Sequence, residues 1–145
     1  LHVDHVGWNT RLLDGRWVPT FPNAKYVFSK KEYDYWFAEH RKEALAHFGD
    51  SVLPIVEAKR AQMVKNDFAL DDEVWLEPTP GHTPGHQSLV VRLPKTGSLV
   101  LSGDAAIVAE QLERFNAAPD KYDARIVAGD AYNVIPETAR MSGTA

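Results

Sequence analysis

Thr79-Pro80-Gly81-His82-Thr83-Pro84-Gly85-His86 is the most informative stretch of this chain, and the β-rich stretch 87–93 follows it. Prolines and glycines at this density produce a tight, rigid loop, which can hold an imidazole in place without a long helix beneath it. A proline-rich turn with incidental histidines is the alternative. Two histidines separated by Thr-Pro-Gly favour a functional loop.

A second motif follows at Leu99-Val100-Leu101-Ser102-Gly103-Asp104. An apolar strand that runs into Gly-Asp brings a carboxylate to its C-terminal end, where a bidentate or bridging metal ligand could lie. Many strands end in Gly-Asp turns, so this motif carries little weight alone.

The chain opens with Leu1-His2-Val3-Asp4-His5, which places three potential metal ligands within four positions. Alternation along a strand would put His2 and Asp4 on one face, and a turn after Asp4 would bring His5 to the same point. Imidazole nitrogens and carboxylate oxygens together suit zinc and similar first-row ions. A polar strand end with two surface histidines stays equally open from these residues alone.

Composition narrows the class of protein. The 145 residues are 44% hydrophobic, which predicts one domain with a buried core. The net charge of -4 is spread along the chain, so we expect neither a nucleic-acid partner nor a membrane-surface patch. The absence of cysteine excludes disulfides and thiolate ligands, so any metal must be held by histidine and carboxylate. No apolar run approaches the ~20 residues of a membrane span and no signal peptide is visible, so we expect a cytoplasmic protein.

The predicted elements mix strands with helices, which indicates an α/β or α+β class. Residues 1–23 are expected to form a strand end and a loop. A capping box at Ser29–Glu32 begins a helix that Gly49 ends, with His40 and His47 packing on its apolar stripe. We expect the four tryptophans in the core or a pocket wall. The remaining prediction is strands at 24–28, 74–76, 87–93, 98–102 and 124–128, helices at 53–64 and 105–115, a hairpin at 94–97 and a polar tail from 136.

Taken together, His-x-Asp-His, Gly-His-x-x-Gly-His and Ser-Gly-Asp, in this order, resemble the metallo-β-lactamase superfamily. Gly7-Trp8-Asn9 and the stretch 80–89 are most similar to its lactonase-like and organophosphate-hydrolase-like branches. The resemblance implies an α/β fold, part of an αβ/βα sandwich in which helices flank a mixed sheet. It also implies two divalent metal ions, with zinc expected.

Carried over by position, the resemblance assigns His2 and His82 to the first metal, Asp4 and His5 to the second, and Asp104 to both. His86 takes the position of a structural residue or one that orients the ligands. The family motif is His-x-His-x-Asp-His, and residues 2–5 match all but its first histidine, which would immediately precede Leu1.

The chain departs from the family at several points. An N-terminal half normally precedes the first motif, so we expect residues 1–145 to be a single, truncated domain. Asp130 stands where a C-terminal histidine ligand is expected, and Ile107 stands where lactonases carry a tyrosine. Tyr122 or Tyr132 would have to compensate for that tyrosine.

The expected function is a metal-dependent hydrolase, in which a metal-bound hydroxide attacks an ester or lactone and Asp4 and Asp104 are catalytic. Hydrolysis of a phosphotriester is the alternative within the enzyme class. A truncated, non-catalytic domain that binds a metal or a partner is the alternative outside it. The expected partners are a small-molecule ester or lactone and further copies of the chain, because half a sandwich leaves an apolar sheet face uncovered.

Overall fold

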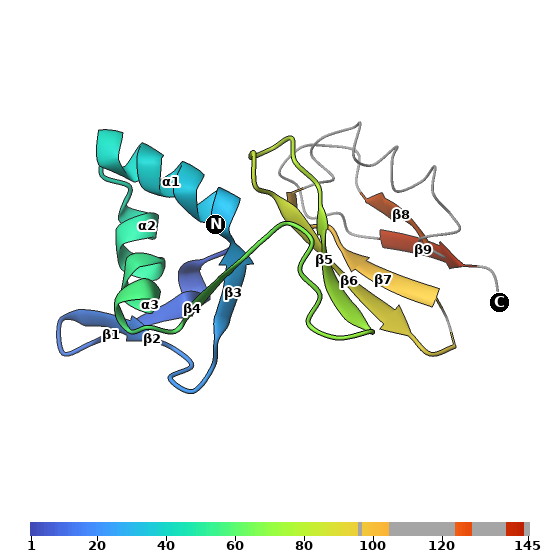
Figure 1. Cartoon of the computed structure of the whole chain (residues 1–145), viewed down its shortest axis with the longest axis horizontal. Helices are drawn as coiled ribbons and strands as arrows, with labels where there is room; N and C mark the ends of the chain where they lie inside the picture. The colour runs from blue at the N-terminus through green and yellow to red at the C-terminus, as the bar shows by residue number, and fades with distance from the viewer. Residues whose placement is uncertain (96, 105–123, 129–138, 144–145) are drawn as a thin grey trace. The chain divides into compact units, whose positions relative to one another are not determined.

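The computed structural model describes residues 1–95, 97–104, 124–128 and 139–143, the last two segments as backbone only. The chain forms two compact units, Leu1–Lys65 and Asn66–Ala145 (Figure 1). Helices occur beside both parallel and antiparallel strand pairs, so the predicted α/β class is confirmed. A single domain over residues 1–145 stays a prediction.

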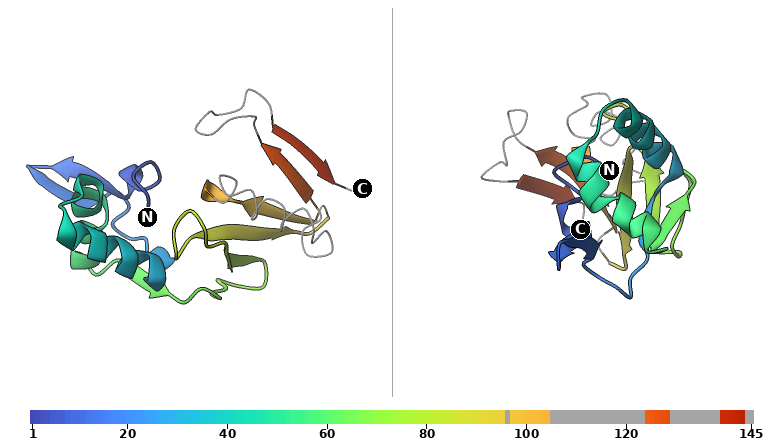
Figure 2. Two further views of the ribbon diagram at one scale, coloured as in Figure 1. Left: turned by 90° about the horizontal axis from the view of Figure 1, so that it is seen from above. Right: turned by 90° about the vertical axis from the view of Figure 1, so that its left-hand side faces the viewer.

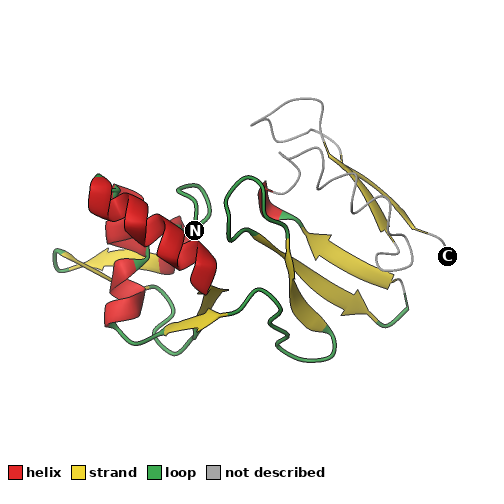
Figure 3. Cartoon of the chain, turned by 45° about the horizontal axis from the view of Figure 1, so that its top comes forward, coloured by secondary structure: helices red, strands yellow, loops and turns green. Residues whose placement is uncertain are grey.

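The first unit combines short strands with helices (Figure 3). Its elements are η1 (Gly7–Asn9), β1 (Thr10–Leu13), β2 (Arg16–Pro19), β3 (Tyr26–Ser29), α1 (Lys30–Lys42), α2 (Ala46–Ser51), α3 (Leu53–Glu57) and β4 (Ala61–Val64).

The loop predicted over residues 1–23 is wrong, because a β-hairpin occupies much of it. Strands β1 and β2 pair antiparallel with Leu13 opposite Arg16. The two residues between them have positive φ angles, 50° at Asp14 and 76° at Gly15. A two-residue turn of this kind matches the twist of antiparallel strands, and Asp-Gly is one of its preferred sequences. Asp14 and Gly15, which from sequence indicated the end of regular structure, therefore form a hairpin turn.

Helix α1 begins as predicted but ends early. The Ser29 hydroxyl accepts a hydrogen bond from the Glu32 backbone N–H at 3.4 Å, as an N-cap does. The helix predicted to continue to Gly49 stops at Lys42, where Glu43 is extended, and Gly49 lies inside α2. At the break, His40 Nδ1 accepts the Leu45 N–H at 3.0 Å. This side-chain bond gives the Leu45 N–H the partner that a continuing helix would have given it. The helix can therefore end here without leaving that N–H unpaired.

The helix predicted over 53–64 is also too long. Helix α3 ends at Glu57, and Lys59 takes a left-handed conformation with φ 56°. The N–H groups of Lys59 and Arg60 bond to the carbonyls of Val56 and Ile55 at 2.9 and 3.0 Å, which is a Schellman motif. The reversed chain then forms β4, which pairs in parallel with β3.

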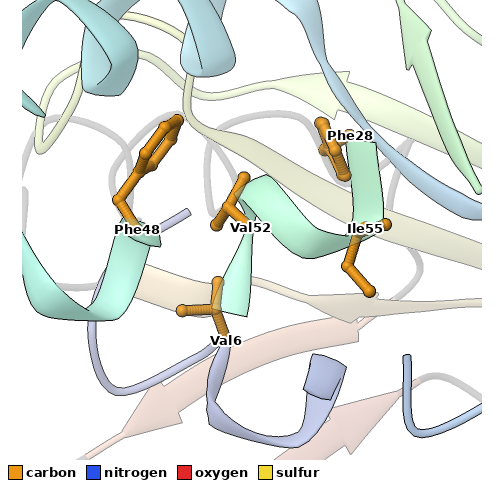
Figure 4. Packing of buried hydrophobic residues seen from close by; sticks show 5 residues of the cluster. All are labelled: Val6, Phe28, Phe48, Val52 and Ile55. Atoms are coloured by element: carbon orange, nitrogen blue, oxygen red, sulfur yellow. The ribbon is translucent and has the colours of Figure 1, made fainter. Parts of the chain in front are cut away.

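The core of the first unit collects residues from distant parts of the sequence (Figure 4). Phe48, Val52 and Ile55 are fully buried against Val6 and Phe28. Val6 follows directly on the opening motif, so burial of this side chain anchors the exposed residues before it. By contrast, Trp8 is 82% exposed on η1, none of whose residues is buried, so a place in the core is wrong for Trp8 and a place in a pocket wall stays a prediction.

The second unit is built on an antiparallel meander of β5 (Val74–Pro78), β6 (Gln87–Leu93) and β7 (Gly97–Leu101) (Figure 2). The predicted hairpin between β6 and β7 is confirmed. Strands β8 (Ala124–Ala128) and β9 (Ala139–Gly143) also pair antiparallel, so the predicted strand at 124–128 is confirmed. The polar tail is wrong over β9, where strand pairing prevails over composition. The helix expected at 105–115 lies outside the described residues. Across the described part of the chain, no helix is long and apolar enough to cross a membrane.

We predict that Lys59→Gly raises the free energy of unfolding by about 1 kcal/mol, because a left-handed conformation costs a residue with a side chain roughly 1–2 kcal/mol. Lys59→Val should lower it, since a β-branched side chain tolerates this conformation poorly. Urea unfolding measures both. Lys25→Gly, at an exposed position without a positive φ, is the control and should be neutral or destabilising. Stabilisation of both glycine variants alike would contradict the argument.

Candidate metal centre

The opening motif forms a turn rather than the predicted strand end. The His5 N–H donates to the His2 carbonyl at 3.1 Å, which closes residues 2–5 into a tight turn. No partner strand is assigned to these residues, so strand alternation is not what brings the side chains together. The turn has the same effect, because it points the side chains on either side of Val3 toward one another.

Three potential ligands form one cluster in this turn, which we call the opening cluster (His2, Asp4 and His5). His2 Nδ1 lies 2.8 Å from Asp4 Oδ1, and His5 Nε2 lies 3.7 Å from Asp4 Oδ2. The Asp4 side chain is 64% exposed, whereas that of His2 is 34% exposed. The two oxygens of one carboxylate therefore each face an imidazole nitrogen.

The carboxyl group of Asp4 has a lowered pKa. The largest cause is the hydrogen bond with the His2 side chain, which outweighs the opposing effect of burial, and its own backbone N–H and the charges of His5 and His2 lower the pKa further. A lowered pKa keeps the group ionised under mildly acidic conditions. Asp4 is therefore available as an anionic oxygen donor.

An aromatic side chain backs His2. The Trp36 ring lies 5.6 Å from the His2 ring, centroid to centroid, and the indole N–H donates to Glu32 Oε1 at 2.7 Å. His47 packs edge-on against the same indole at 5.5 Å. Burial, and then the charge of His2, lower the pKa of His47 and favour its neutral form. The packing roles predicted for His40 and His47 are confirmed, since the rings of both contact aromatic residues.

The proline–glycine loop between β5 and β6 closes on itself. The Thr79 N–H donates to the His86 carbonyl at 3.0 Å, and the Gly81 N–H donates to the Thr83 carbonyl at 3.2 Å. Gly81 has a φ of 155°, at the edge of the range that favours glycine. The loop is thus held by its own backbone, as its sequence predicted.

This loop carries His82 to the end of β7. His82 Nε2 lies 3.5 Å from Asp104 Oδ2, and the two side chains are 25% and 11% exposed. We call these two residues the loop pair. Asp104 lies three residues beyond Leu101, the last residue of β7, so the carboxylate comes from the strand end that the Ser-Gly-Asp motif indicated.

His86 turns both of its ring nitrogens toward protein groups. Nδ1 lies 2.8 Å from Thr79 Oγ1, and Nε2 accepts the Asp104 backbone N–H at 3.1 Å. This geometry fits a residue that orients others and not a metal ligand.

Within each unit, then, the structure groups the residues that the sequence singled out. His2, Asp4 and His5 lie together in the first unit, and His82 and Asp104 lie together in the second. That all five bind metal stays a prediction. Ile107, Tyr122, Asp130 and Tyr132 lie outside the described residues.

Sequence reasoning missed the buried polar residues beneath the loop. Thr79 is 1% exposed and Ser88 is fully buried, and Glu77 is also buried on β5 opposite Ser88. A serine and a glutamate inside short strands carry no signal of their own. Thr79 offered one, since it directly precedes the Pro-Gly-His run.

Comparison with known proteins gives a family. A family model described as the metallo-beta-lactamase superfamily matches residues 1–134. An N-acyl homoserine lactonase of a Bacillus species is 34% identical over 113 residues, which cover 78% of this chain and 38% of that protein. The N-acyl homoserine lactonase AttM of Agrobacterium fabrum is 36% identical over 121 residues, covering 78% of this chain and 41% of AttM. The chain thus spans about two fifths of the length of these relatives.

A solved structure supports the fold. The hydrolase AbOPH of the beta-lactamase superfamily superposes with a TM-score of 0.61, over 88% of this chain and 53% of that one. The sequence identity is 22%, so this likeness bears on the fold alone.

The close approach of Gly103 to His86 generates a prediction. Gly103 has φ 54°, and a Cβ there would lie 3.2 Å from His86 Nε2. Gly103→Ala should therefore lower the free energy of unfolding by more than the roughly 1–2 kcal/mol that a left-handed alanine costs.

Two controls separate strain from contact, with urea unfolding as the measurement. Gly15→Ala has a positive φ but open space around its Cβ, and Gly7→Ala has open space and no positive φ. The expected order of destabilisation is Gly103, then Gly15, then Gly7. Equal losses at Gly103 and Gly15 would show that the contact with His86 has no effect.

Proposed function

Because this chain belongs to the metallo-β-lactamase superfamily, we propose that it is the metal-binding part of a metal-dependent hydrolase that opens a lactone or cleaves an ester. The observation that carries the proposal is the grouping of nitrogen and oxygen donors in the opening cluster and the loop pair. Both groups come from the motifs that define the order of the family's ligands.

The donor geometry fits a metal. Two ligands of one tetrahedral zinc, each about 2.0–2.2 Å from the ion, lie roughly 3.4 Å apart. The separation of 3.5 Å between His82 Nε2 and Asp104 Oδ2 is close to this value. His5 Nε2 and Asp4 Oδ2, at 3.7 Å, are also near it. The sequence contains no cysteine, so the donors are those of a mixed nitrogen and oxygen site.

We assign His2, His82 and Asp104 to a first ion, and Asp4, His5 and Asp104 to a second. The assignment follows the order of the family motif, with Asp104 shared. When bound, divalent ions such as zinc would supply Lewis acidity, which lowers the pKa of water toward ~7 and polarises a carbonyl oxygen. The first set holds two imidazoles and the second holds one, so the first should select zinc more strongly.

The chain's own residues would position water and accept its proton. Asp4 is ionised and largely exposed, so its carboxylate can accept a hydrogen bond from water and then take the proton. The water oxygen forms a bond to the carbonyl carbon, the carbon–oxygen bond of the ester or lactone breaks, and the proton passes to the departing alkoxide. Asp104 is buried beside His82, which suits a fixed ligand more than a mobile base.

A lactone is the favoured substrate, because both curated relatives compared above are N-acyl homoserine lactonases. Ile107 replaces the tyrosine that lactonases carry at this position, so carbonyl binding must differ in detail. A phosphotriester is the alternative, since the same donors would serve attack at phosphorus. A cytoplasmic location stays a prediction.

We predict that His82→Ala lowers the metal content of the purified protein, because it removes one of two donors in the loop pair. Elemental analysis for zinc, manganese, iron and cobalt is the measurement. Ring opening of an acyl homoserine lactone, hydrolysis of an aryl ester and hydrolysis of an aryl phosphotriester should all fall together.

His40→Ala is the matched control, because His40 is a half-buried histidine outside both donor groups. It should keep its metal. Equal metal in wild type and His82→Ala would remove His82 from the site. Metal-free wild-type protein that stays without metal in excess zinc would instead favour a non-catalytic association domain.

We also propose that the chain associates with a second copy. In the first unit Trp8, Leu12 and Phe21 are each more than half exposed, which is apolar area that association would cover. Light scattering should give a mass of at least twice 16.2 kDa. A monomer that persists at high protein concentration would rule the proposal out, and Trp8→Ser should reduce the association if η1 takes part.

A further inference from the structure

A continuous line of hydrogen bonds runs beneath the loop pair. It links the Asp104 N–H to His86 Nε2 at 3.1 Å, and His86 Nδ1 to Thr79 Oγ1 at 2.8 Å. It goes on from Thr79 Oγ1 to Ser88 Oγ at 3.0 Å, and from Ser88 Oγ to the Ser102 carbonyl at 3.1 Å. Thr79 follows β5, His86 precedes β6 and Ser88 lies within it, and Ser102 and Asp104 follow β7.

The two ends of this line determine its direction. A backbone N–H can only donate, so His86 Nε2 must carry a lone pair, and the neutral ring then holds its proton on Nδ1. The Nδ1–H then donates a hydrogen bond to Thr79 Oγ1, and the threonine hydroxyl donates to Ser88. A carbonyl can only accept, so the Ser88 hydroxyl donates to Ser102. Each bond in the line is consistent with this one arrangement of protons.

We propose that His86, held by Thr79, is a positioning residue that fixes the backbone of Asp104 and thereby aims its carboxylate at the metal; this rests on the proposed metal-binding function. Thr79 and Ser88 are buried almost completely, where hydrogen bonds are strong and an unmade one is costly. The line therefore holds His86 in one ring orientation, and His86 passes that orientation to the Asp104 N–H.

Gly103 completes the arrangement. Its φ of 54° bends the chain so that the following N–H faces the imidazole, and a side chain there would meet His86 Nε2 at 3.2 Å. The glycine of the Ser-Gly-Asp motif is thus explained by the ring packed against it. Both requirements act on the same short segment, the one that carries the proposed bridging ligand.

A direct ligand role for His86 is disfavoured by the same contacts. Nε2 uses its lone pair on the Asp104 N–H, and Nδ1 faces a buried hydroxyl. A purely structural role, in which His86 only ties the loop to the sheet, is the alternative that the experiment must separate.

The experiment measures Co²⁺ affinity by competition with a chelating dye, together with the visible spectrum of bound Co²⁺. His86→Leu should bind Co²⁺ roughly 10–100-fold more weakly, the usual range for loss of a group that orients a ligand, and with a changed spectrum. His86→Gln should recover part of the affinity, because an amide oxygen can accept the Asp104 N–H. Thr79→Val should weaken binding less than His86→Leu, and Thr79→Ser should restore it.

His40→Leu is the matched control for fold stability. His40 also accepts a backbone N–H through a ring nitrogen, that of Leu45 at 3.0 Å, but holds no proposed ligand. Both leucine variants should lose stability in urea, and only His86→Leu should lose Co²⁺ affinity. Equal affinity in wild type and His86→Leu, or equal losses in the two leucine variants, would overturn the proposal.

A measurement on metal-free protein keeps this proposal distinct from the proposed function. Nitrogen-15 NMR of the histidine rings should show the proton of His86 on Nδ1, and hydrogen exchange should show a protected Asp104 amide that His86→Leu exposes. A proton on Nε2, or an Asp104 amide that exchanges equally fast in both proteins, refutes the positioning role. If wild type shows both signatures yet binds no Co²⁺, the proposed function fails while the placement of Asp104 by His86 stands.

Discussion

The hydrogen bond from the Asp104 N–H to His86 Nε2 is the constraint on which the second unit's candidate site depends. It joins the end of β7 to the loop that carries His82, although 17 residues separate His86 from Asp104. Among the described residues, the loop is held by its own backbone bonds and by this contact. Because the bond is to a backbone N–H, it acts on the path of the chain and does not involve the carboxylate of Asp104.

The first unit supports its donors in another way. The opening cluster is exposed and lies in a turn, but Val6 directly after it is buried in the core with Phe28 and Ile55. Trp36 and Glu32 then limit how the His2 ring can turn. The two units therefore hold their donors by different interactions. The first unit uses the burial of an apolar side chain, and the second uses a buried line of hydrogen bonds.

The residues of the candidate site were predictable from sequence because they come in dense motifs with little room for other placements. His2, Asp4 and His5 lie within four positions, so almost any compact turn brings them together, and the predicted strand was not needed. Strand β6 and its hairpin were predictable because alternation and a Pro-Lys-Thr-Gly turn agree. His86 was assigned its supporting place from the resemblance, and the structure supplies the reason in its two ring contacts.

The predictions that were wrong concern the ends of elements, which tertiary contacts determine. The apolar stripe of α1 continues past Lys42, yet a bond between His40 and Leu45 allows the chain to leave the helix. At α3, Lys59 takes the position where glycine is usual, so composition gave no sign of the reversal. Strand β9 is small and polar and exists through its pairing with β8. In each case a specific contact determines the structure, and the local sequence pattern does not encode that contact.

The parallel pairing of β3 with β4 has a consequence for the order of folding. Residues 30–60 lie between these strands, whereas the hairpins β1–β2 and β6–β7 join neighbouring segments. Closing a long connection lowers the entropy of the chain before strand pairing can compensate for the loss. Local hairpins therefore form sooner than a parallel pair. Val6 belongs to the same core cluster as Phe28 of β3 and Ile55 of the connection, so this cluster is complete only after the crossover has closed. The turn at residues 2–5 is therefore among the last parts of its unit to become ordered.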